Sequence, residues 1–200
     1  MTADTLPPLV YWGEQSLMKT QQPVTVEDLG RADWDQKVDQ LVTCMSAYGG
    51  IGIAAPQVGW DARVFCLGIV DDNPRYPSAQ SLPLQVWVNP EIVTSSGQCW
   101  AWEGCLSVPG LRGWVSRPEQ ISVKGLDQTG AEVCQTLDGF AARVFQHELD
   151  HLDGILIPMR VPHARFLLSN ELMEQRQNWQ SDWPSPGAYA TDPGLTSTIR

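Results

Sequence analysis

The chain has 200 residues, 42% of them hydrophobic, and a formal net charge of -10, which argues against a protein that binds DNA or another phosphate backbone. No stretch reaches the roughly 18 consecutive apolar residues of a membrane-spanning helix, so we expect no membrane partner. The length suits a single domain, which we expect over residues 1–180.

The N-terminal residues and the cysteines indicate a cytoplasmic protein. Residues 1–10 contain neither the basic and apolar regions of a secretory signal nor the arginines of a transit peptide. The five cysteines are an odd number, widely spaced, in a chain that is large enough to fold without disulfides. We therefore expect reduced thiols, with at least one available as a metal ligand.

The first predicted element is an amphipathic helix that begins after Asp33, whose side chain can cap it, and ends at Gly49. The small residues of 50–57 predict an irregular loop. Strands are expected over residues 63–70 and 84–93, and a polar loop with prolines joins them.

The second half of the chain is expected to contain strands, two helices and a tail. Strands are predicted over residues 98–102, 113–126 and 131–137, helices over 140–152 and 163–179, and a mobile tail over 181–200. Several short strands followed by a helix are typical of an α+β fold. We expect short, mostly antiparallel β-sheets packed around a central metal-binding helix, with an N-terminal and a C-terminal helix.

The helix predicted over residues 140–152 carries the pattern H-E-x-x-H. His147 and His151 are four residues apart, so both imidazoles lie on one helical face and can bind one metal ion. Glu148 stands where a general base for a metal-bound water is expected. The chain has only three histidines, so two in one motif are unlikely to be a chance cluster. The pattern predicts a metallohydrolase.

A catalytic metal site needs a third protein ligand and an open position for water. Ile157 occupies the position of the third histidine of metzincin-like proteases, which excludes that class. Glu171 lies 20 residues beyond His151, at the spacing of the third ligand in thermolysin-like peptidases. Cys105, beside a glycine and after a predicted strand, is the other candidate. Spacing alone leaves Glu171 and Cys105 both open.

Three segments of the chain, taken together, resemble the signature motifs of the peptide deformylase family. They are GIGIAAPQ at residues 50–57, EGCLS at 103–107 and QHELDH at 146–151. The resemblance covers roughly residues 9–160. It implies a hydrolase that removes the formyl group from N-formylmethionine of newly made polypeptides, giving formate and a free amino terminus. The implied partners are formyl-Met nascent peptides, with a transient ribosome contact.

The resemblance also implies a ligand set, Cys105, His147 and His151, with water in the fourth position. Ferrous iron is the expected native metal, with zinc, nickel or cobalt as substitutes, because a thiolate and two imidazoles suit these ions better than magnesium or calcium. Under this reading the alternative, a metallopeptidase with Glu171 as third ligand, becomes the second hypothesis.

The resemblance assigns the catalytic groups as well. Glu148 is the expected general base, which takes a proton from water and returns it to the leaving amine. The side-chain amide of Gln57 and the backbone N–H of Leu106 are the expected donors to the oxyanion. One such donor typically contributes about 2.7–4 kcal/mol in the transition state.

The substrate-binding residues are expected on both sides of the metal. Phe140 and Val144 lie on the same helical face as His147, and Ile51 would close the pocket from the other side. Glycines let the backbone pass close to the substrate. Arg112 is expected to contact the peptide near the entrance. The full predicted set is Gly50, Ile51, Gly52, Gly104, Arg112, Phe140 and Val144.

Overall fold

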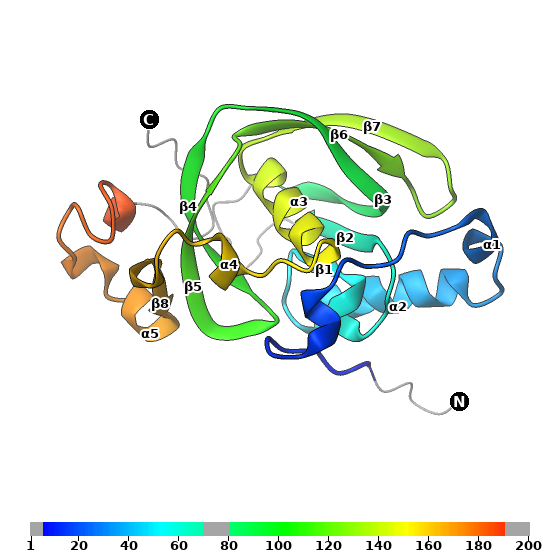
Figure 1. Ribbon diagram of the computed structural model, residues 1–200, viewed down its shortest axis with the longest axis horizontal. Coiled ribbons are helices and arrows are strands. Elements are labelled where there is room, and N and C mark those ends of the chain that lie inside the picture. The colour runs from blue at the N-terminus through cyan, green and yellow to red at the C-terminus, as the bar shows by residue number, and fades with distance from the viewer. Residues whose placement is uncertain (1–5, 70–80, 191–200) are drawn as a thin grey trace.

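The computed structural model describes residues 6–69 and 81–190 (Figure 1). The helices are α1 (Val26–Leu29), α2 (Trp34–Ala47), α3 (Gly139–Leu152), α4 (Ile157–Arg160) and α5 (Asn170–Met173). The strands are β1 (Gly52–Ala54), β2 (Val64–Ile69), β3 (Leu82–Ser96), β4 (Cys99–Cys105), β5 (Val108–Arg117), β6 (Gln120–Leu126), β7 (Glu132–Asp138) and β8 (Leu167–Ser169). Short 3-10 helices span Gln15–Met18, Ala55–Val58, Ala164–Phe166, Arg176–Asn178 and Ala188–Ala190.

The strands form two antiparallel sheets, in the orders β1-β2-β3-β6-β7 and β4-β5-β8. Figure 1 shows α3 at the centre of the molecule, with β4 and β5 on one side and β1 and β2 on the other. On the larger sheet, Phe145 of α3 packs edge-on against Phe65 and Trp87, with ring centroids 5.0 Å apart in both pairs. The α+β class and the central helix are confirmed.

The predicted N-terminal helix is confirmed as α2, but its expected cap is wrong. The side chain of Asp33 accepts no capping hydrogen bond from the backbone of α2. Its carboxylate binds Arg31 and, one helical turn further on, Lys37 at 3.0 Å instead. The apolar stripe still decides the element, because Val38, Leu41 and their neighbours on one face of α2 are buried.

Two predicted segments form different elements because tertiary pairing decides them. Residues 50–57 are not irregular: β1 pairs with β2, and a 3-10 helix follows. The single strand predicted over 113–126 is two strands, β5 and β6, which belong to different sheets. Pro118 lies between them and lacks the N–H that a continuous strand would need.

The C-terminal helix predicted over residues 163–179 is wrong. The chain there forms a 3-10 turn, the strand β8 and the four-residue helix α5. Leu111 of β5 pairs with Ser169, so β8 extends the smaller sheet. The side chain of Ser169 then caps α5 at the N–H of Leu172. Pairing with β5 therefore overrides a helical pattern that was weak along this segment.

Part of the segment predicted to be a mobile tail, residues 181–190, is packed on the smaller sheet. Trp183 and Ala188 pack with Trp102 and Trp114 of the smaller sheet, and Ala188 is fully buried. Residues 191–200 lie outside the described residues, as do 70–80, which include most of the predicted polar loop. The domain boundary at residue 180 stays a prediction. No helix in the described ranges is long and apolar enough to cross a membrane.

Gly154 ends α3 with a left-handed backbone, φ +74°. A side chain there would place its Cβ 2.7 Å from the backbone nitrogen of Lys19. We expect Gly154→Ala to lower the free energy of unfolding in urea by about 1–3 kcal/mol from the backbone conformation alone, and by more through this contact. Gly59→Ala is the control, because Gly59 has φ +79° and open space around it. Equal losses in both variants would contradict the contact with Lys19.

Candidate metal centre

Three predicted ligands come together between β4 and α3. Cys105 is the last residue of β4, and His147 and His151 lie one turn apart on α3. One ligand atom from each side chain lies within 4.8 Å of the other two. Cys105 Sγ is 3.3 Å from His151 Nε2. The structure therefore places one sulfur and two imidazole nitrogens where a single metal ion can reach all three.

Glu171, the rival third ligand, does not join this cluster. It lies in the first turn of α5 and is exposed, and hydrogen bonds from its own backbone N–H and from Ser169 lower its pKa. In the described part of the chain the cluster able to hold a metal consists of Cys105, His147 and His151. The geometry does not favour the Glu171 alternative.

Glu103 orients the imidazole of His147. Its Oε2 lies 3.0 Å from His147 Nδ1. Although burial opposes ionisation, the charge and hydrogen bonds of Arg117 hold the pKa of Glu103 well below its usual range. An ionised carboxylate only accepts, so Nδ1 carries the proton and Nε2 remains free to bind a metal.

A buried charge network supports Glu103 in turn. Arg117 donates to both carboxylate oxygens, at 2.6 and 2.9 Å, and Arg143 of α3 donates to Oε1 at 2.6 Å. Arg117 also donates to Asp150 at 2.9 Å, and Arg160 pairs with the same carboxylate. Sequence reasoning missed this network. Strand alternation offers one signal for it, because Glu103 lies two residues before Cys105 and so faces the same way.

The carboxylate of Glu148 is buried in this site and incompletely hydrogen-bonded. Its side chain projects from α3 beside His147, the residue is 4% exposed, and Oε2 has no hydrogen-bond partner among the described residues. Burial raises the pKa of Glu148 to about 7. A carboxylate with such a pKa can both take and return a proton near neutral pH, which is what a general acid–base group requires.

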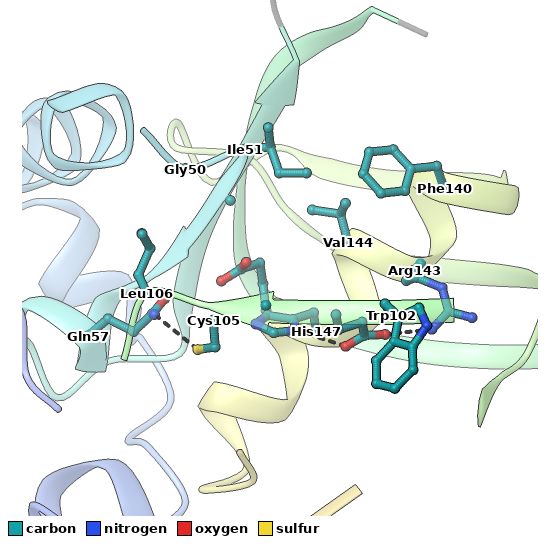
Figure 2. A pocket seen from close by; sticks show the side chains of 14 residues that line it. Gly50, Ile51, Gln57, Trp102, Cys105, Leu106, Phe140, Arg143, Val144 and His147 are labelled. Atoms are coloured by element: carbon teal, nitrogen blue, oxygen red, sulfur yellow. Dashed lines mark hydrogen bonds and ion pairs between the residues drawn. The ribbon is translucent and has the colours of Figure 1, made fainter. Parts of the chain in front are cut away.

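Gln57 presents its amide nitrogen to the site. Its Oε1 accepts the backbone N–H of Ala54 at 2.8 Å. Because that N–H can only donate, the orientation of the amide is determined, and Nε2 faces Ser107 Oγ at 3.1 Å and Cys105 Sγ at 3.9 Å. The 3-10 turn after β1 thus aims a neutral donor at the cluster (Figure 2).

A single pocket gathers most of the predicted residues. Figure 2 shows Ile51 of the first motif facing Phe140 and Val144 of α3. Three lining residues were not in the predicted set: Trp102, Glu103 and Arg143. The pocket is lined by Gly50, Ile51, Gly52, Gln57, Trp102, Glu103, Gly104, Cys105, Leu106, Phe140, Arg143, Val144, His147 and Glu148.

Arg112 is the predicted substrate residue that does not line this pocket. It lines a neighbouring groove, which shares Gly104, Cys105 and Leu106 with the pocket. A Cβ added to Gly104 would lie 3.1 Å from the guanidinium carbon of Arg112, so the guanidinium packs on the glycine. Its contact with a peptide stays a prediction.

Comparison with known proteins places the chain among close relatives. A family model described as polypeptide deformylase matches residues 6–166. The chain is 43% identical over 154 residues to peptide deformylase 2 of Pseudomonas putida, covering 76% of this chain and 86% of that protein. It is 48% identical over 138 residues to peptide deformylase 1 of Prochlorococcus marinus, covering 68% and 71%.

Solved structures give the same result. The Met-Ala-Ser-bound class I type b peptide deformylase of Acinetobacter baumannii superposes with a TM-score of 0.75 at 41% identity, covering 78% of this chain and 99% of that one. A peptide deformylase of Synechococcus elongatus in complex with actinonin superposes with a TM-score of 0.69 at 32% identity, covering 80% and 82%.

Proposed function

The chain belongs to the polypeptide deformylase family, and on that premise we propose that Cys105, His147 and His151 hold the divalent metal of its active site. The enzyme removes the N-formyl group from N-formylmethionine, releasing formate and a free amino terminus. The observation that carries the proposed site is the cluster of Cys105, His147 and His151, two members of which, Cys105 and His147, line one pocket with Glu148 and Gln57.

The donor set fits a divalent metal of intermediate softness. One thiolate and two imidazoles suit ferrous iron, which we propose as the native ion, and zinc, nickel or cobalt as substitutes. The hydrogen bond that His147 Nδ1 donates to Glu103 supports this fit, because it leaves His147 Nε2 free to coordinate a metal. When bound, such a metal acidifies water and polarises the formyl carbonyl.

Side-chain and backbone groups of the protein transfer the proton and stabilise the negative charge of the oxyanion. Glu148 takes a proton from the attacking water at its unpartnered Oε2 and returns it to the leaving amine nitrogen as the formyl C–N bond breaks. The Nε2 of Gln57 and the backbone N–H of Leu106 donate to the oxyanion. The fixed orientation of the Gln57 amide supports this role, because a preorganised donor costs no reorganisation during the reaction.

We propose that the methionine side chain enters the pocket between Ile51, Phe140 and Val144. Apolar groups on opposite sides of the pocket, within reach of Glu148, support this placement. The peptide backbone would pass Gly50, Gly52 and Gly104, which carry no side chains of their own. Arg112 would contact the peptide further along, and its buried Nη1, without a hydrogen-bond partner among the described residues, supports that role.

The proposed partners follow from where formylated chains arise. Formyl-Met nascent peptides are made on ribosomes, so we propose action in the cytoplasm with a transient ribosome contact. The Acinetobacter baumannii enzyme was solved with Met-Ala-Ser, and the ligand proposed here is the formylated form of such a peptide. We further propose that residues 1–180 form one catalytic domain.

Formate release tests the proposed function. Anaerobically purified protein loaded with ferrous iron or nickel is expected to release one formate per formyl-Met-Ala-Ser and to leave the Met-Ala bond intact. Acetyl-Met-Ala-Ser is the matched control substrate, because its acetyl group is larger by one methyl group than the small formyl group that the site accepts. Cleavage between methionine and alanine without formate would instead indicate the metallopeptidase hypothesis.

Gly52 leaves room for the carboxylate of Glu148. A Cβ at Gly52 would lie 2.5 Å from Glu148 Oε1 and 2.8 Å from its Cδ. Gly52→Ala is therefore expected to displace Glu148 and lower kcat/KM by about 100-fold, near the lower end of a general base's contribution. Metal analysis of the same sample is expected to show full occupancy. Unchanged kcat/KM would contradict the position given to Glu148.

A further inference from the structure

Strand β4 carries site residues on one face and tryptophans on the other. Glu103 and Cys105 face α3, as their contacts with His147 and His151 show. Trp102, between Ala101 and Glu103, belongs to the aromatic cluster of the smaller sheet, and it also lines the edge of the pocket. It stands directly across from Trp114 of β5, with ring centroids 5.2 Å apart.

Strand β4 lies at the edge of its sheet. The order β4-β5-β8 gives it one backbone partner among the described strands, β5. The ladder between β4 and β5 also shifts register between Gly104 and Cys105. Because an edge strand has backbone hydrogen bonds on one side only, its position and twist depend on side-chain packing. In β4 this packing determines the positions of Glu103 and Cys105.

Residues 167–188, which we call the C-terminal clasp, cover the tryptophan face of this strand. Trp102 Nε1 donates to the carbonyl oxygen of Ala188 at 3.1 Å. The ring of Trp179 meets Trp102 edge-on, with centroids 5.8 Å apart, and Trp183 packs against Trp179 at 4.8 Å. Trp102 is left 1% exposed. Figure 1 shows this orange-to-red segment beside β4 and β5, opposite α2.

The clasp lies beyond the part of the chain that the family model matches, which ends at residue 166. The Acinetobacter baumannii structure is covered over 99% of its length but matches only 78% of this chain. Trp114 packs on Trp102 from inside the matched region, and the contacts from Trp179 and Ala188 come from residues beyond it.

We propose that the C-terminal clasp positions the metal site by holding Trp102, and through it Glu103 and Cys105, against α3. The inference rests on the proposed metal centre. Trp102 is a positioning residue: its ring and its indole N–H bind the clasp and fix the strand, while Glu103 and Cys105 face the metal site. Loosening the clasp lets the edge strand shift, which misplaces the thiolate and weakens the bond from Glu103 to His147.

Metal affinity of the full-length protein tests the proposal. Trp179→Ala, a change in the clasp itself, is expected to raise the dissociation constant for nickel, measured by competition with a chelator, by about 10- to 100-fold, the range found when groups that hold ligands are removed. Trp179→Phe keeps an edge-on ring against Trp102 and is expected to restore most of the affinity. Near-ultraviolet circular dichroism of the metal-free protein is expected to change in Trp179→Ala, because the ring contacts are lost.

Trp60→Ala is the matched control. Trp60 also packs edge-on against another tryptophan, Trp34, at 5.6 Å, but on the α2 side of the molecule. It is expected to lower thermal stability without changing nickel affinity. If Trp179→Ala lowers stability but keeps wild-type nickel affinity, the proposal that the clasp positions the metal site is wrong. Should Trp179→Ala not fold, Trp102→Phe, which loses only the bond to Ala188 and part of the ring, carries the same test.

Failure of the clasp and failure of the proposed function are distinguishable. Wild-type protein that binds nickel but releases no formate would overturn the deformylase activity and leave the affinity comparison intact. Wild-type protein that releases formate, with Trp179→Ala equal to it in nickel affinity and kcat, would overturn the clasp alone.

Discussion

Glu148→Ala is expected to lower kcat for formate release by about 10²–10⁴-fold, the usual contribution of a general acid–base group, while the protein keeps its metal. The reason lies in the environment of the carboxylate, which is buried, lacks a hydrogen-bond partner at Oε2 among the described residues, and has a pKa raised to about 7 by burial. Steady-state kinetics on formyl-Met-Ala-Ser, with metal analysis of each sample, measure the effect.

Two further variants serve as controls for the loss of kcat in Glu148→Ala. Glu148→Gln keeps the volume of the side chain but not its basicity, and it is expected to be as inactive as Glu148→Ala. Glu171→Gln alters an exposed carboxylate outside the cluster and is expected to match the wild type. A Glu148→Ala enzyme that retains most of its kcat at full metal occupancy would show that another group moves the proton.

Cys105→Ala is expected to remove the bound metal, and Glu171→Ala is expected to leave it in place. Loss of groups that merely support ligands typically costs 10–100-fold in metal affinity, so loss of the thiolate is expected to exceed about 100-fold. Metal content after dialysis against a chelator measures the difference, and formate release should disappear with the metal in Cys105→Ala. Metal loss confined to Glu171→Ala would reverse the ligand assignment.

The metal helix was predictable because its signals are local. The i, i+4 spacing of His147 and His151 and the stripe formed by Phe140 and Val144 specify one helix and its functional face without reference to the rest of the chain. The third ligand was not local. Spacing left Cys105 and Glu171 open, and the choice came from a resemblance across three motifs and then from the ligand-atom geometry.

The charge network behind His147 was out of reach of sequence reasoning for a physical reason. Glu103 and Arg117 meet because β4 and β5 pair in a particular register, and Arg143 reaches Glu103 from a different element, α3. Sequence patterns report which face of an element is apolar, but not which polar groups will share a buried space. The same limit explains β8, whose identity depends on the free edge of β5.

The measurement that tests the metal centre most directly is X-ray absorption at the metal edge of the loaded wild-type protein. Ligation by Cys105, His147 and His151 predicts one sulfur and two imidazole nitrogens, with lighter oxygen scattering from water. Cys105→Ser should lose the sulfur contribution. A wild-type spectrum without sulfur, or with four protein ligands and no water, would contradict a catalytic centre built on this cluster.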